Sequence, residues 1–355
     1  MPNWYVSREA VKQAASVFGT ERNARVDDII EGESRRLDRI TRRFFIPQTL
    51  TRLFAWPQPH GIRADQLILD QDLISVTTLQ TKAQDDSPTT ISSDDFFVEP
   101  VNEGPPFSRI EIDQSSDASF ESGDTPQRSI SVAGSWGFSN DTKAAGTVAS
   151  GLDSSASAVS MVCSDASLID VGDTLLIESE QVFVSERVAA AEPNNDLIDG
   201  ALTATQSQVG VTVDDGTRYS AREIILVDSE QMFIDSISSN TLTVRRAFNG
   251  SVLAAHSNDA PVSVFRTLTV ERGVNGTTAA THANSTAITK YMPERDVATL
   301  VRAEVVAIVA QEAASWGRNV GAGEGAIEFK GTSLEKLRKE TYRRYTRNFV
   351  RTAVV

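Results

Sequence analysis

Few residues of this 355-residue chain have the types and spacing that catalysis or metal binding requires. The chain has one cysteine, Cys163, so neither an internal disulfide framework nor a cysteine-based zinc site is expected. Its three histidines, His60, His256 and His282, leave little material for acid–base chemistry or for a metal centre. We therefore expect no metal site and no cofactor, and we interpret these four residues as structural.

Two glycine-containing stretches come close to catalytic or nucleotide-binding motifs. The stretch AGSWG at 133–137 is one residue short of the G-x-S-x-G elbow, and no helix is expected directly after it, which argues against Ser135 as an acyl-transfer nucleophile. The stretch GAGEGA at 321–326 lacks a Lys-Ser/Thr ending and carries Glu324 where phosphate would lie. The sequence therefore predicts no catalytic residues, and a binding or assembly protein is favoured over an enzyme.

Paired aspartates at 85–86, 94–95 and 214–215 are a third group that could do chemistry. Their spacing does not match that of a calcium-binding loop, so we interpret them as solvated loop residues. No run of about 18 apolar residues and no secretion signal is present, so we expect neither a membrane span nor export from a cytoplasm-like compartment. With 40% hydrophobic residues, the chain can form one large domain or two to three smaller ones.

The net charge of −14 is divided unevenly along the chain. Residues 1–63 hold 11 Lys/Arg against 7 Asp/Glu, and residues 293–355 hold 11 against 8. Residues 64–140 hold 3 Lys/Arg against 14 Asp/Glu, and residues 141–292 hold 9 against 19. Two basic ends therefore enclose an acidic middle. The acidic middle is not expected to bind nucleic acid, because phosphate binding needs clustered positive charge.

Helices are expected at the N-terminal end. Ser7 is expected to cap a first helix that ends at Gly19, and a second helix is expected from Thr20 or Asn23 to about Phe45. Apolar residues recur at helical spacing along one face of the second helix. Its opposite face is either solvated and paired with glutamates one turn away or a ring or partner interface. That face carries Arg35, Arg36, Arg39, Arg42 and Arg43.

Helices are also expected at the C-terminal end. One is expected to start at Pro293 and run to Trp316, and a last one to be capped by Ser333. The last helix has an apolar side, and its other positions are mostly basic. We predict that it is an arm that becomes fully ordered only on binding a partner. The residues predicted to make that contact are Lys336, Arg338, Lys339, Tyr342, Arg343, Arg344, Arg347, Phe349 and Arg351.

Short strands are expected through the middle of the chain. Between residues 50 and 140 they suggest a small antiparallel sheet. Beyond it, IESEQVFV at 177–184 is similar to VDSEQMFI at 227–234, 50 positions later, whereas LTVRRAFNGSVLAAH at 242–256 is similar to LTVERGVNGTTAATH at 268–282, 26 positions later. Two spacings are explained if one β module lies in a loop of a related one.

We therefore predict an inserted β region at 141–292 with two nested modules. Module one is predicted to consist of 168–188 plus 267–292, and module two of 206–266. The turn SSN at 238–240 is expected to close a hairpin, and the Asn-Gly pairs at 249–250 and 275–276 are expected to form tight turns with positive φ. Because His256 and His282 fall at equivalent positions, both are interpreted as structural.

The order of motifs outside this region resembles the head-tail connector (adaptor) family of tailed double-stranded DNA phages. In that family a Leu/Ile-Asp step and an Arg-Phe pair at the end of a helix lead to a Thr-Arg-Leu/Tyr-Phe strand. The corresponding residues here are Leu37, Asp38, Arg43, Phe44, Thr51, Arg52, Leu53 and Phe54. The later Gly-Trp/Phe-Gly-Phe/Tyr strand end matches 134–138, and Pro293 starts the helix that follows it in the family. The insertion of roughly 150 residues between Phe138 and Pro293 departs from the family pattern.

The resemblance implies an α+β fold. Its helical connector core would consist of the N- and C-terminal helices plus a small antiparallel sheet, with 1–140 as the first part and 293–355, including the C-terminal arm, as the second. The all-β region at 141–292 would be inserted into this core and project outward.

The resemblance also implies a function and partners. The protein would be a structural virion protein at the head–tail junction, assembled in the host cytoplasm as a homo-oligomeric ring, commonly of twelve copies. The ring would bind the portal protein, with the basic arm reaching into the portal, and tail or neck proteins. It would let double-stranded DNA pass during genome ejection, and its β insertion would meet capsid or other neck proteins. The alternative is a carbohydrate-binding or adhesion protein acting through the duplicated modules, against which the lack of tryptophan in 141–292 weighs.

Overall fold

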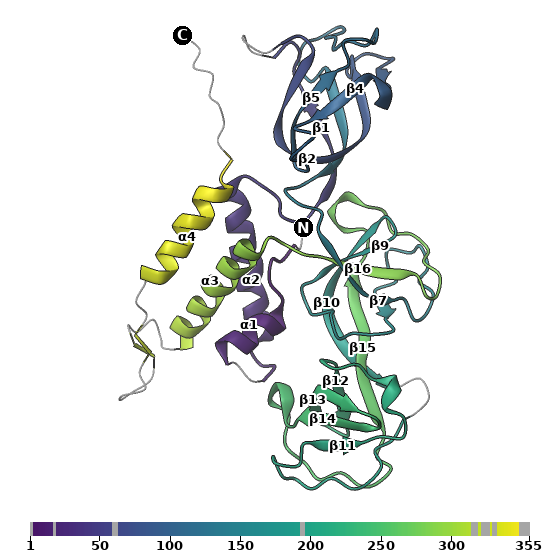
Figure 1. Ribbon diagram of the computed structural model, residues 1–355, viewed down its shortest axis with the longest axis vertical. Helices are drawn as coiled ribbons and strands as arrows, with labels where there is room; N and C mark the ends of the chain where they lie inside the picture. The colour runs from purple at the N-terminus through teal and green to yellow at the C-terminus, as the bar shows by residue number, and fades with distance from the viewer. Residues whose placement is uncertain are drawn as a thin grey trace.

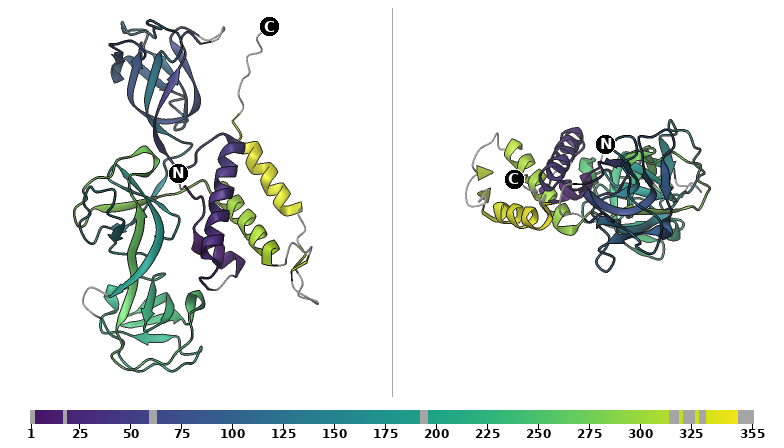
Figure 2. Two further views of the ribbon diagram at one scale, coloured as in Figure 1. Left: turned by 180° about the vertical axis from the view of Figure 1, so that it is seen from behind. Right: turned by 90° about the horizontal axis from the view of Figure 1, so that it is seen from above.

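A helical layer and three β lobes make up the protein, and the lobes lie in a row beside the helices (Figures 1 and 2). The architecture comes from a computed structural model. It describes residues 3–16, 19–58, 63–191, 196–313, 319–320, 327–328 and 332–347.

The helical layer contains α1 (Arg8–Ala15), α2 (Asn23–Thr41), α3 (Arg295–Ala313) and α4 (Thr332–Tyr345). The expected cap of α1 is confirmed, since the Ser7 hydroxyl accepts a hydrogen bond from the Ala10 amide. Helix α2 ends before the expected position because Arg42 takes a left-handed conformation, with φ 56°. The chain then turns inward and buries Phe45 in the core that the helices share with the middle lobe.

The first β lobe forms one sheet of six antiparallel strands. They are β1 (Gln48–Phe54), β2 (Gln66–Thr81), β3 (Thr89–Ile91), β4 (Phe96–Glu99), β5 (Phe107–Ile112) and β6 (Ile130–Trp136). The strand order is β1-β6-β2-β5-β4, with β3 paired to β2. The lobe has its own core, in which Trp136 is fully buried.

A second antiparallel sheet of ten strands forms the other two lobes. Its strands are β7 (Thr142–Thr147), β8 (Ser160–Val162), β9 (Thr174–Ile177), β10 (Glu180–Ala191), β11 (Gly210–Thr212), β12 (Ile224–Val227), β13 (Glu230–Ser238), β14 (Thr241–Arg245), β15 (Val262–Glu271) and β16 (Ala287–Tyr291). The order is β11-β14-β13-β12-β15-β10-β9-β16-β7, with β8 on β15. Two short strands, β17 (Asn319–Val320) and β18 (Ile327–Glu328), pair only with each other.

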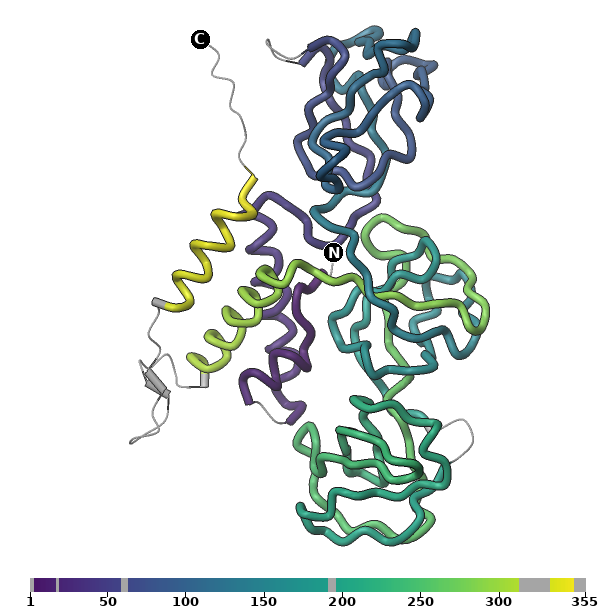
Figure 3. The backbone as a smooth tube through the Cα atoms, viewed as in Figure 1, coloured from purple at the N-terminus to yellow at the C-terminus, as the bar shows by residue number. Residues whose placement is uncertain are grey.

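The long strands β10 and β15 connect the two lobes of this sheet. They pair from Phe183 opposite Glu271 in the middle lobe to Ala191 opposite Ser263 in the end lobe. The chain leaves the middle lobe along β10, forms β11 to β14 and returns along β15 (Figure 3). The middle lobe includes Ala145 and the end lobe includes Ile198, which lie before the predicted starts of the modules at 168 and 206. From here on, module one means the whole middle lobe and module two the whole end lobe. Each has a separate apolar core.

The expected fold class, a helical connector core with a small sheet, is wrong. The chain is mostly β, with 36% strand and 22% helix, and its two large sheets are antiparallel. Helical spacing is visible within one stretch of sequence, whereas β1 pairs with β6, which lies far along the chain, so strand content is easily underestimated. In the described part of the chain, no helix has the length and apolar character needed to cross a bilayer.

Candidate interaction surfaces and buried charge clusters

Module one contains a buried cluster of a glutamate, an arginine and a histidine. The carboxylate of Glu180 accepts hydrogen bonds from Nε and Nη2 of Arg272 at 2.6 and 2.8 Å. The two ring nitrogens of His282 lie 2.8 Å from oxygens of Glu180 and Glu178. The side chains of Glu180, Arg272 and His282 are all 0% exposed. The cluster fastens the β9–β10 hairpin to the segment that follows β15.

Module two repeats this cluster. Glu230 accepts hydrogen bonds from Nε and Nη2 of Arg246, both at 2.7 Å. The ring of His256 lies between Glu230, at 3.0 Å, and Asp228, at 2.7 Å. Backbone amides of Ala247 and Ala254 also donate to Glu230. We call these two clusters the Glu-Arg-His triads.

The triads are structural because they are sealed from solvent and their two glutamates stay ionised. Burial by itself raises the pKa of Glu180, but hydrogen bonds from Arg272, the Ala280 amide and His282 outweigh it and lower this pKa to about 2. The pKa of Glu230 is lowered to about 2 by the corresponding contacts, against the effect of burial. A carboxylate with such a pKa is a poor general base. The burial of both histidines agrees with the structural role expected for them.

The arginine-rich face of α2 is divided between internal and exposed side chains. Arg35 pairs with Asp38 at 2.9 Å, Arg36 with Glu33 at 2.9 Å, and Arg43 with the buried Asp72 at 2.6 Å. Arg39 and Arg42 are exposed. Arg35, Arg36 and Arg43 therefore form ion pairs within the subunit.

The basic positions of α4 divide in the same way. Arg338 pairs with Glu304 of α3, Arg344 with Asp296 at 2.7 Å, and Arg347 with Asp72 at 2.9 Å. Lys336, Lys339 and Arg343 are exposed, and Tyr342 is half-buried against the helical core. Phe349 and Arg351 lie outside the described residues. Helix α4 therefore packs on α3 along its length.

A joint connects the helical layer to the first β lobe. Arg43 of the α2 terminus and Arg347 beyond α4 both bind the Asp72 carboxylate of β2. Phe138, which follows β6, places its ring centroid 5.3 Å from that of Tyr345, and its amide donates to the Phe44 carbonyl at 2.7 Å. Sequence motifs that lie far apart in the chain thus meet at one place.

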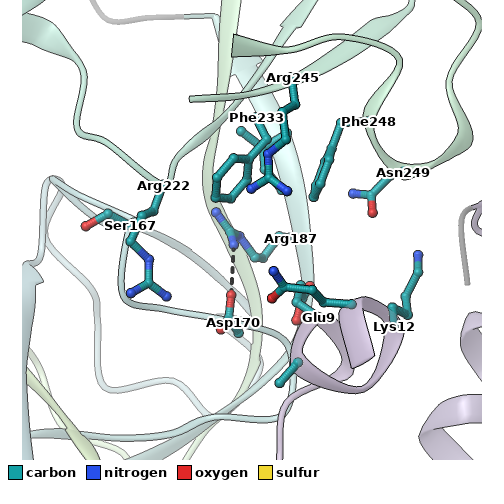
Figure 4. Close-up of a pocket in the computed structure, with 13 residues that line it drawn as sticks. Glu9, Lys12, Ser167, Asp170, Arg187, Arg222, Phe233, Arg245, Phe248 and Asn249 are labelled. Atoms are coloured by element: carbon teal, nitrogen blue, oxygen red, sulfur yellow. Dashed lines mark ion pairs between the residues drawn. The ribbon is translucent and has the colours of Figure 1, made fainter. Parts of the chain in front are cut away.

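A cavity of about 300 Å³ lies between α1, module one and module two (Figure 4). One wall is apolar and aromatic: Phe233 and Phe248 lie with ring centroids 5.1 Å apart, and the Arg245 guanidinium lies 4.2 Å from the Phe233 centroid. The charged residues that line the cavity are Glu9, Lys12, Asp170, Arg187, Arg222 and Arg245. Burial, and then the charge of Asp170, raise the pKa of Glu9 to about 8. Sequence reasoning did not find this cavity, because its walls come from three distant segments.

The remaining residues considered for chemistry are not assembled into a site. Ser135 lies within β6, paired on both sides, and burial raises the pKa of the Cys163 thiol to about 12. His60 and Glu324 lie outside the described residues. The described ranges contain no group of three or more histidine, cysteine or acidic side chains arranged to hold a metal. No protein-family model, no curated protein and no solved structure matches the chain.

Proposed function

We propose that the protein is a structural, non-enzymatic virion subunit that forms a homo-oligomeric ring between the portal vertex and the tail of a phage. In this proposal the exposed cations of the helical layer of one subunit contact the acidic first β lobe of the next. The partners of the ring would be the portal protein and tail or neck proteins, with DNA passing through the ring. The proposal follows from the motif resemblance and is supported most by the separation of charge within the subunit.

The helical layer carries exposed cations, alongside exposed acidic residues such as Glu31 and Glu335. Arg39, Lys339 and Arg343 are exposed, and none has an ion-pair partner among the described residues. These three cations can therefore pair with acidic residues of a neighbouring subunit.

The first β lobe presents the opposite charge. It contains exposed acidic residues that have no ion-pair partner in the described part of the chain: Asp86, Asp94, Glu103, Asp117 and Asp124. Complementary surfaces on different parts of one subunit favour a heterologous, head-to-tail contact, and such contacts close into rings when the rotation between subunits permits.

The joint at Asp72 is a second observation that supports the proposal. Arg43, Phe44 and Phe138 belong to the motifs shared with the connector family, and here they contact one another or a common partner. Such a joint fixes the acidic lobe relative to the helical layer, and a fixed angle between two complementary surfaces is what a closed ring requires.

Electron microscopy and sedimentation of the purified protein test the proposal. At low salt we expect closed rings that dissociate as the salt concentration rises, because exposed charge pairs are screened. Arg39→Glu combined with Arg343→Glu should abolish the rings, whereas Lys143→Glu, an exposed charge reversal on module one, should not. Adding Asp94→Lys and Asp124→Lys to the first pair should restore assembly. A protein that stays monomeric at low salt and high concentration, or rings indifferent to the Arg39/Arg343 variant, would refute the proposal.

A further inference from the structure

The same binding face occurs twice in the molecule, covered in module one and open in module two. Phe183 and Phe233 occupy equivalent positions on β10 and β13, and so do Gln181 and Gln231. Asn275 and Asn249 are equivalent residues of the two Asn-Gly turns, with φ of 57° and 52°. The two faces therefore carry matching residues at equivalent positions.

In module one this face binds the chain's own N-terminal segment. Asn3 and Asn275 donate to each other through their side-chain amides, at 2.8 Å in both directions, and Asn275 also donates to Gln181 at 2.8 Å. The Trp4 ring packs edge-on against Phe183, with centroids 5.4 Å apart. As a result Phe183 is 3% exposed and Asn275 is 1% exposed. This face therefore binds a segment that supplies an asparagine and an aromatic side chain, and we call it the seat.

In module two no segment of the described chain covers this face. Asn249 donates to Gln231 at 3.0 Å, as its counterpart does, but no described residue takes the place of Asn3. Phe233 and Phe248 remain half-buried and line the cavity beside α1 (Figure 4). The seat is therefore present in module two, but no described segment covers it.

Two substitutions between the modules change what the open seat can accept. Arg222 stands where module one has Gly172, and a Cβ at Gly172 would lie 2.2 Å from the Trp4 ring. An indole therefore cannot occupy the equivalent place in module two. Arg245 stands where module one has Glu271, so the charge beside Phe233 is reversed as well. The face that accommodates Trp4 in module one therefore carries two guanidinium groups in module two, those of Arg222 and Arg245.

The cations that face the opening exceed the anions. Arg187 is committed to Asp170, 3.5 Å away, and Arg245 also pairs with the exposed Asp235 at 3.0 Å. Lys12 donates to Asn23, and Arg222, which is exposed, has no ion-pair partner among the described residues. The remaining acidic residue, Glu9, accepts a hydrogen bond from the Val171 amide at 3.0 Å, and its raised pKa of about 8 leaves it largely protonated at neutral pH. Positive charge thus remains for an occupant to neutralise.

We propose that the cleft between α1 and module two binds an extended acidic peptide segment of another protein. A carboxylate of that segment pairs with Arg222 and Arg245, an amide group bonds Asn249 in the way that Asn3 bonds Asn275, and an apolar side chain packs on Phe233 and Phe248. The proposal does not rest on ring formation, because the cleft lies within one subunit.

Selection of peptides from an unbiased 12-residue display library against the full-length protein tests this proposal. We expect enriched peptides to contain Asp or Glu next to an apolar residue. In fluorescence anisotropy, Arg222→Glu should weaken binding of the enriched peptide by at least about tenfold, the loss of one charge-assisted contact. Asn249→Ala should weaken binding severalfold, and Lys143→Glu, the matched surface control, should leave it unchanged.

Three results would overturn the proposal. One is the absence of any enriched acidic peptide, and a second is binding that Arg222→Glu does not weaken. The third is a different occupant of the cleft, either a glycan on an array or a second copy of the chain in sedimentation. Arg222→Glu would abolish the binding of that occupant, and acidic peptides would not compete with it. Thermal melting of each variant verifies that the fold is intact. Arg222→Glu is expected to match the wild type because Arg222 is exposed, and Asn249→Ala to melt slightly lower because alanine disfavours the φ of 52° at this turn.

Discussion

Replacing Glu230 with glutamine should destabilise module two far more than a nearby change of the same chemistry. The carboxylate of Glu230 receives two hydrogen bonds from Arg246, one from His256 and two from backbone amides. Glutamine keeps the shape of the side chain but removes its charge and places an NH₂ group against donors. Arg246, whose side chain is 0% exposed, is then left as an uncompensated buried charge. Breaking a buried pair in this way costs about 3–5 kcal/mol.

Asp228→Asn is the matched control. Asp228 contacts the same imidazole, with its carboxylate oxygen 2.7 Å from Nδ1 of His256, but its side chain is 57% exposed. Water can replace the lost contact, so the expected cost is about 0–1 kcal/mol. The two carboxylates contact the same imidazole, but only that of Glu230 is buried and paired with an arginine.

Urea denaturation and hydrogen exchange resolved by mass spectrometry measure the two effects. Glu230→Gln should remove exchange protection from β11 to β14, while β8 and β9 keep theirs because module one has its own core. Asp228→Asn should leave both modules protected. Equal losses of stability in the two variants, or a loss below about 1 kcal/mol for Glu230→Gln, would show that the triad does not hold module two together.

Further predictions concern the open seat and the response to acid. Arg222→Gly combined with Phe248→Val should convert the module-two seat to the module-one type. In fluorescence anisotropy, a labelled peptide Asn-Trp-Tyr-Val-Ser should then bind the variant and not the wild type. Equal binding to both would contradict the equivalence of the two faces. The free energy of unfolding should be steady above about pH 5 and fall as the pH drops from about 4.5 towards 2, because the pKa values of Glu180 and Glu230 are about 2 in the folded protein and near 4.5 when unfolded, so the unfolded chain binds protons first. Urea titrations across this range measure the effect, and a slope no steeper than that of the Glu180→Gln/Glu230→Gln variant would rule out this origin.

Short-range signals in the sequence predicted local structure well. Ser7 caps α1, and the turn at Ser239 closes the β13–β14 hairpin. Asn249 and Asn275 take the expected positive φ. In each case the determining contact lies within a few residues, so the local sequence contains the physical information that fixes the conformation.

Long-range pairing is the reason why the fold class was wrong. The first lobe has six strands, and β1 at 48–54 finds its partner β6 at 130–136 across the whole lobe. Most of these strands are short, so their own sequence patterns are weak compared with the long periodic pattern of α2. The helical ends therefore dominated the prediction, although strand residues, at 36%, outnumber helical residues, at 22%.

The sequence repeat contains the glutamates and arginines of the triads as well as their histidines. Glu180 and Glu230 lie at equivalent positions, and so do Arg272 and Arg246, alongside the two histidines. Matched charged residues of opposite sign within an apolar pattern were a usable signal for a buried ion pair. The cavity offered no such signal, because Glu9 and Phe233 come together only through the packing of α1 beside module two.

The two modules differ most where their chemistry faces outward. Both keep the buried glutamate, arginine and histidine, whose loss would leave a charge unpaired in the interior. Gly172 and Glu271 on the covered face correspond to Arg222 and Arg245 on the open face. Because exposed substitutions cost little stability, such changes can alter what a face binds without affecting the fold. The strands β10 and β15 run continuously through both modules, so they hold the altered face beside α1 and give the cleft its second wall before any partner arrives.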